Sequence, residues 1–127
     1  MKMTDHLGVR EGICEFRPGG ESTLVEIVAL ITEAVAYCRH QGISKLLVSA
    51  NDLRGVSIPT LVDRFLMMEE WAQAARGMLV AAIVAHSEYI HPEKFGVKVA
   101  ADLGLVVDVF TSEPEALKWL STYRPPD

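Results

Sequence analysis

Residues 45–85 read KLLVSANDLRGVSIPTLVDRFLMMEEWAQAARGMLVAAIVA, and this stretch decides the fold of the chain. Two runs of mostly aliphatic residues, 45–50 and 78–85, flank a helical pattern at 57–76. A strand, a helix and a second strand in this order predict a βαβ unit with two parallel strands in one sheet. Because consecutive residues of both runs are apolar, we expect both faces of the sheet to be covered.

The same alternation continues on both sides of this unit. The strand patterns lie at 12–17, 45–50, 78–85 and 106–110, and the helical patterns lie at 23–40, 57–76, 91–103 and 112–123. We predict an α/β fold in a single domain spanning 1–127, with a mostly parallel sheet of four or five strands and about four helices. Alternating polar and apolar residues at 12–17 predict an edge strand, and we expect residues 1–10 and 124–127 to be frayed.

Hydroxyl side chains mark the expected helix starts. Thr23 stands three residues before Glu26, and Ser112 stands three residues before Glu115. This spacing is typical of a capping box, in which two otherwise unpaired backbone N–H groups are satisfied. Ser57 precedes a proline by two residues, which predicts a helix that begins at Ser57 with the proline in its first turn.

The composition is that of a folded protein, with 50% hydrophobic and 23% charged residues. The net charge of -5 argues against nucleic acid and anionic membranes as partners, since both bind clustered Lys and Arg. No apolar run approaches the roughly 20 residues of a membrane span, and the N-terminal residues do not resemble a secretory signal. We therefore expect a cytoplasmic protein without a membrane span.

The chain has two cysteines, Cys14 and Cys38, and they lack the CxxC spacing of metal and redox sites. We expect them to be reduced and buried, while the sequence alone leaves a disulfide between them open. The sequence also lacks Gly-x-Gly-x-x-Gly, a P-loop and Gly-x-Ser-x-Gly. We therefore predict no metal, no cofactor and no catalytic residue.

Polar residues gather in the loops after the predicted strands, and such loops meet at one edge of a parallel sheet. Asp52 and Arg54 could bind a cation and an anion there, or they could form a simple turn. His86, Glu88 and His91 form the densest set of potential ligands. Their spacing matches no zinc motif, so a structural loop is the simpler interpretation.

The second predicted helix carries more apolar surface than one buried stripe requires. Its expected core positions are Ile58, Leu61, Val62, Phe65, Met68, Ala72 and Ala75. Leu66 and Met67 fall outside this arc, and Trp71 lies at its margin. These three residues predict a homodimer interface, with burial inside the domain as the alternative.

Two segments resemble a known family. The first is 52–56, Asp-Leu-Arg-Gly-Val, between a predicted strand and a predicted helix, and the second is 110–120, FTSEPEALKWL, which introduces the last helix. With the order of elements over most of the chain, they resemble the small stand-alone bacterial members of the SpoIIAA-like group in the STAS/SEC14 superfamily. The resemblance implies a STAS-like sandwich, and the founding members of the group are anti-sigma-factor antagonists.

In regulatory members of that family, a serine at the start of the helix after this turn is phosphorylated, and the added charge breaks a partner interaction. Ser57 occupies roughly that place, so the resemblance makes it a candidate binding residue. The chain departs from the family's Asp-Ser-Ser-Gly signature, because it reads Val-Ser-Ile-Pro-Thr at 56–60. A helix cap is the alternative role of Ser57.

Two functions from different classes follow. The first is a non-enzymatic regulatory or protein-interaction module of STAS type, which acts through a protein partner or as a homodimer. The second is a carrier of a small molecule or lipid, with an apolar pocket between helices and sheet and with Asp52, Arg54 and the loop 86–91 at its mouth. An enzyme that uses the histidines of this loop comes third.

Overall fold

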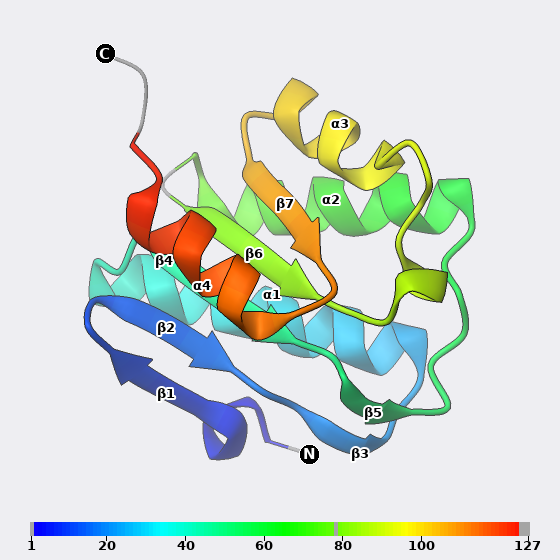
Figure 1. The fold of residues 1–127 in the computed structure, drawn as a ribbon, viewed down its shortest axis with the longest axis horizontal. Coiled ribbons are helices and arrows are strands. Elements are labelled where there is room, and N and C mark those ends of the chain that lie inside the picture. Colours follow the sequence, from blue (N-terminus) through cyan, green and yellow to red (C-terminus); the bar gives the residue numbers. More distant parts are fainter. Residues whose placement is uncertain (1, 78, 125–127) are drawn as a thin grey trace.

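The computed structural model describes residues 2–77 and 79–124, and Figure 1 shows their arrangement. The main sheet has five strands in the order β1 (Leu7–Arg10), β2 (Ile13–Phe16), β4 (Lys45–Ser49), β6 (Val80–Val84) and β7 (Val106–Phe110). Strand β1 is antiparallel to β2, and the other neighbours are parallel. The predicted α/β class and mostly parallel sheet are therefore confirmed. Met78, at the start of the predicted run 78–85, lies outside the described residues, as does 125–127.

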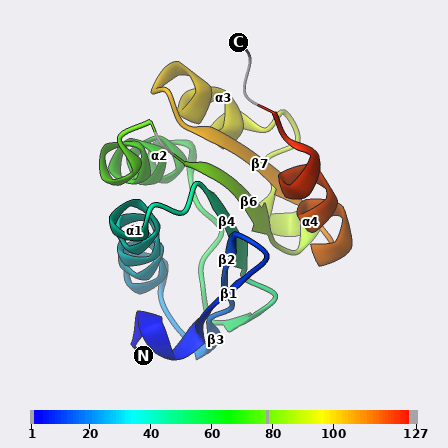
Figure 2. The same ribbon diagram turned by 90° about the vertical axis from the view of Figure 1, so that its left-hand side faces the viewer.

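The helices cover both faces of this sheet, as Figure 2 shows. They are α1 (Leu24–Gln41), α2 (Leu61–Ala75), α3 (Phe95–Asp102) and α4 (Glu113–Thr122), with short 3-10 turns η1 (Met3–His6) and η2 (Ser87–Tyr89). Helices α1 and α2 lie on one face and α4 lies on the other, while α3 packs against α2 and β7. Along β4, Leu46 and Val48 join the core under α1 and α2, whereas Leu47 joins the core under α4. Strands that are apolar on both sides are thus buried on both sides.

The N-terminal segment corrects two expectations. Residues 7–10 form β1 and Met3 is buried, so the predicted fraying of 1–10 is wrong for the described residues. Strand β2 consequently lies between β1 and β4 and is not an edge strand. The cause is the two-residue turn Glu11-Gly12, whose φ angles of 53° and 79° match the twist of a tight hairpin. Glutamate is uncommon at the first of these positions, so the sequence does not predict this hairpin.

Helix α2 begins at Leu61, four residues later than predicted. Its cap is Thr60, whose Oγ1 accepts a hydrogen bond from the Asp63 N–H at 3.1 Å, while the Asp63 carboxylate accepts from the Thr60 N–H at 2.9 Å. Residue 58 precedes a proline, and that position disfavours helical backbone. The expectation that Ser57 opens this helix is therefore wrong, and Ser57 lies in an exposed loop.

A small second sheet holds the loops that follow β2 and β4. Strand β3 (Gly19–Glu21) runs parallel to β5 (Asp52–Arg54), and the Ser22 N–H donates to the Arg54 carbonyl at 3.0 Å. The sequence predicts only turns at both places, since glycines and polar residues are poor strand formers. Pairing between the two segments supplies the backbone hydrogen bonds that their composition does not suggest.

Two further expectations concern α3 and the cysteines. The helix predicted at 91–103 is shorter, because a turn occupies 92–93 and α3 begins at Phe95. Cys14 and Cys38 are free, buried thiols, as expected. A hydrogen bond to the neighbouring Cys14 side chain, together with burial, raises the pKa of the Cys38 thiol.

Candidate functional site

Helix α2 has a buried half and an exposed half. Met68, Trp71 and Ala75 are buried in its later turns. Its first turns, with the loop before them, expose Ile58, Leu61, Val62, Phe65 and Leu66. The predicted core arc is therefore wrong for this first half. Trp71 is also no surface residue, since it is 3% exposed and its Nε1 donates to the Val28 carbonyl at 3.2 Å.

A cavity of about 240 Å³ lies beneath the first half of α2, at the C-terminal edge of the main sheet. Most of its wall is apolar. Side chains that define this wall are Ile27, Val28 and Ile31 of α1, Met67 and Met68 of α2, and Ile83 of β6. From α2 the wall contains Arg64, Met67, Met68 and Trp71, whereas the exposed residues of its first half are not part of the wall.

Polar groups enclose one end of the cavity. Arg64 of α2 donates from Nη1 to the Tyr89 carbonyl at 2.9 Å, and the Tyr89 hydroxyl donates to the Val56 carbonyl at 2.7 Å. All three residues line the cavity. This chain of hydrogen bonds ties the η2 turn to Arg64 of α2 and to the loop before that helix.

The predicted loop residues His86, Glu88 and His91 lie at the same cavity. The His86 Nε2 is 3.4 Å from the Asn51 carbonyl oxygen, and the His91 Nδ1 accepts the Glu93 N–H at 3.1 Å. A neutral His91 ring therefore carries its proton on Nε2. Within residues 2–77 and 79–124, no group of three or more His, Cys, Asp or Glu side chains is placed to hold a metal ion.

The other predicted site residues lie outside the cavity wall. Asp52 and Arg54 belong to β5, and the Arg54 Nε donates to the exposed Glu21 Oε1 at 3.3 Å. Their neighbours Leu53 and Val56 line the cavity instead, while Ser57 does not. The structure therefore brings only the 86–91 loop to the site, because pairing with β3 holds the polar side chains of β5 elsewhere.

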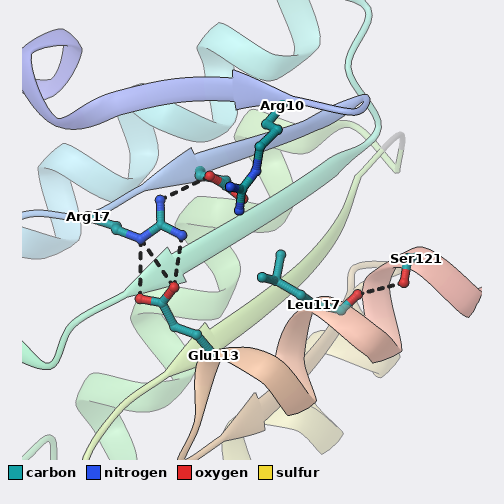
Figure 3. A network of polar contacts seen from close by, with 6 residues as sticks. Arg10, Arg17, Glu113, Leu117 and Ser121 are labelled. Carbon is teal, nitrogen blue, oxygen red and sulfur yellow. Dashed lines mark hydrogen bonds and ion pairs between the residues drawn. The ribbon is translucent and has the colours of Figure 1, made fainter.

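A second polar cluster lies on the opposite face of the sheet (Figure 3). Glu15 is 7% exposed and accepts from Arg10 and from Arg17, both at 3.0 Å. Arg17 also donates to Glu113 at the start of α4, with a shortest distance of 2.8 Å. These hydrogen bonds raise the pKa of Arg17 and lower the pKa of Glu113. The cluster joins α4 to β2 and leaves no free charge for a ligand.

Comparisons with known proteins identify the fold alone. No family model and no curated protein matches the chain. Among solved structures, the chain is similar to the NMR structure of the protein TM1081, with a TM-score of 0.53 and 12% sequence identity. The similarity covers 92% of this chain and 88% of that one. None of the helices in the described residues has the length and apolar character needed to cross a membrane.

Three polar residues of the cavity wall were not singled out from the sequence: Arg64, Tyr89 and Lys94. Arg64 lies within a strongly helical segment, where a single arginine reads as part of a solvated helix face. The signal that could have found it is its position in the first turn after Thr60, because the start of a crossover helix faces the C-terminal ends of the strands. Placing that start at Ser57 removed this signal.

Proposed function

We propose that this protein binds a small apolar molecule in the cavity beneath α2. The observation that carries the proposal is an apolar cavity at the C-terminal edge of a parallel sheet, with a few polar groups at one end. Ligand sites in proteins have this composition, and α/β folds hold them at this edge. The volume of about 240 Å³ is below the roughly 300–1,000 Å³ of drug-sized sites, so the ligand is small.

Two variants of α1 and 1-octanol as the probe test this proposal. Val28→Trp fills the cavity, whereas Val25→Trp adds the same bulk one turn earlier at a position that is 80% exposed. A ligand at ten times its Kd adds about 1.4 kcal/mol to the free energy of unfolding, which raises the Tm of a domain of this size by roughly 3–6 °C. We expect this rise in the wild type and in Val25→Trp but not in Val28→Trp. No rise in the wild type, or an equal rise in all three proteins, contradicts the proposal.

The second candidate function is a STAS-type regulatory or protein-interaction module that forms a homodimer. The observation that favours it is the exposed first half of α2, where Leu66 is 54% exposed and Val62 is 67% exposed. Contiguous apolar side chains of this kind are typical of interaction surfaces. Dimer mass in native mass spectrometry supports this candidate and monomer mass at micromolar concentration opposes it. A cytoplasmic location stays a prediction from the sequence.

A further inference from the structure

Arg64 brings a positive charge into the apolar cavity. It is half-buried, it lines the cavity wall, and its Nη1 donates to the Tyr89 carbonyl at 2.9 Å. Burial lowers the pKa of this guanidinium, because removal from water disfavours the charged form. Arginine nevertheless stays protonated in proteins, so Arg64 is a fixed cation in the cavity wall.

No carboxylate among the described residues neutralises this cation. The ion pairs of residues 2–77 and 79–124 are five, and none of them includes Arg64. The neighbouring Asp63 accepts a hydrogen bond from the helix cap Thr60. Glu88 is exposed at the rim and takes part in none of the five pairs. Arg64 is thus a partly desolvated charge whose only hydrogen-bond partner in the described structure is a neutral carbonyl.

The other charged groups at the cavity are balanced or exposed. Lys94 is paired with Asp108 at 2.8 Å. His86 is exposed, and the His91 ring already accepts a backbone hydrogen bond through Nδ1. Two charged groups of the lining thus have no ionic partner among the described residues: the half-buried Arg64 beside the apolar wall, and Glu88, which is exposed to water at the rim.

A guanidinium has five N–H groups in a planar fork, and within residues 2–77 and 79–124 only one nitrogen of Arg64 has a hydrogen-bond partner. The remaining N–H groups match the two oxygens of a carboxylate, which arginine binds in a bidentate manner. A single positive charge also balances a single negative charge, whereas a phosphate monoester carries nearly two at neutral pH. The charge and the geometry therefore favour a carboxylate.

We propose that the cavity binds a small carboxylate amphiphile, with the carboxylate on the free N–H groups of Arg64 and the apolar body against Val28, Met67 and Ile83. This inference rests on the proposed function, because it names the ligand class of the same cavity. Without Arg64 the cavity would select for apolar character alone.

The test compares the affinities of octanoate, 1-octanol and octyl phosphate, all below the concentrations at which they aggregate, by isothermal titration calorimetry at neutral pH. The proteins are the wild type, Arg64→Gln, Arg64→Lys and the control Arg76→Gln. Arg76 ends the same helix, is exposed and lies outside the cavity wall, so its substitution removes the same charge at a distance.

We expect the wild type and Arg76→Gln to bind octanoate at least about 10-fold more tightly than 1-octanol, since a charge-assisted hydrogen bond contributes that much. Arg64→Gln loses this preference and keeps its affinity for 1-octanol. Arg64→Lys keeps part of the preference, because it retains the charge without the fork.

Four results would overturn the proposal, and each leads to a different conclusion about the cavity. Equal affinity of the wild type for octanoate and 1-octanol leaves the apolar cavity as a site without a charged anchor. Tighter binding of octyl phosphate replaces the carboxylate with a phosphate ester. An equal loss of affinity for octanoate and for 1-octanol in Arg64→Gln means that Arg64 acts by holding Tyr89 in place through their hydrogen bond. Binding of no probe to the wild type removes the proposed function as well.

Discussion

Two half-buried arginines on opposite faces of the sheet differ in what surrounds them. Arg17 donates to two carboxylates, Glu15 and Glu113, and these bonds raise its pKa. Arg64 donates to one backbone carbonyl beside an apolar cavity, and burial lowers its pKa. The charge of Arg17 is balanced by carboxylates within the fold, whereas the charge of Arg64 has no carboxylate partner in the described structure. The partners of a buried charge, more than its burial, therefore separate a structural arginine from one available to a ligand.

The largest expected effect is on stability, from Arg17→Met. This change leaves the buried Glu15 with only the exposed Arg10 as a partner, and an unpaired buried charge is costly. Because Arg17 is itself 37% exposed, solvent screening reduces the loss to about 2 kcal/mol. Arg64→Met, the matched variant, loses one hydrogen bond and at most about 1 kcal/mol. Urea denaturation measures both, and equal losses would remove the distinction between the two arginines.

A smaller effect concerns acid stability and Glu113. Hydrogen bonds from Arg17 hold the pKa of Glu113 below its ordinary value near 4.5. The folded state therefore favours the ionised carboxylate, and the resulting stability is present above pH 4.5 and lost as the pH falls through the lower folded pKa. Glu113→Gln should cost about 1 kcal/mol at neutral pH and should flatten the loss of stability between about pH 5 and pH 2.

Urea denaturation at a series of pH values checks this second prediction. Glu115→Gln is the control, because Glu115 is exposed, lies on the same helix and has no side-chain ion pair in the described structure. An acid profile of Glu113→Gln that coincides with the wild type would show that the carboxylate does not stabilise the junction of β2 and α4.

The smallest expected effect comes from Asp108→Asn. The side chains of the Lys94–Asp108 pair are 48% and 27% exposed, so solvent screens the pair and its removal should cost about 0.5 kcal/mol or less. Asparagine can still accept the Val109 N–H that the Asp108 Oδ1 accepts. The change frees a second positive charge at the cavity and should tighten octanoate binding by about two-fold. Weaker octanoate binding in calorimetry would oppose a positively charged anchor at this site.

Sequence patterns predicted the elements whose signals are local. Thr23 caps α1, as expected, and Gly42 ends the helix in the left-handed conformation. The missed elements depend on distant partners, because β3 and β5 become strands only through each other. Strand β1 depends on a turn in which Glu11 adopts a positive φ, a conformation that glutamate rarely adopts and that the sequence therefore does not predict.

The candidate site also combines a feature that the sequence predicts with features that depend on distant residues. The 86–91 loop was predicted at the edge of the sheet, since connectivity alone places it there. The cavity itself depends on how far the side chains of α1 and α2 fall short of filling the space above β6, and no periodicity in the sequence reports that. Arg64 gains its significance from the carboxylates that are absent around it in the described structure, which only three dimensions reveal.

The most direct test of the account is a titration of the ¹⁵N-labelled protein with octanoate, followed by the amide chemical shifts. We predict that the largest changes in chemical shift cluster around the cavity, at Arg64, Tyr89 and Ile83, while the shifts of Arg17 and Glu113 stay unchanged. Shifts that cluster on the Arg17 face, or that are absent from the cavity at saturating octanoate, would contradict it.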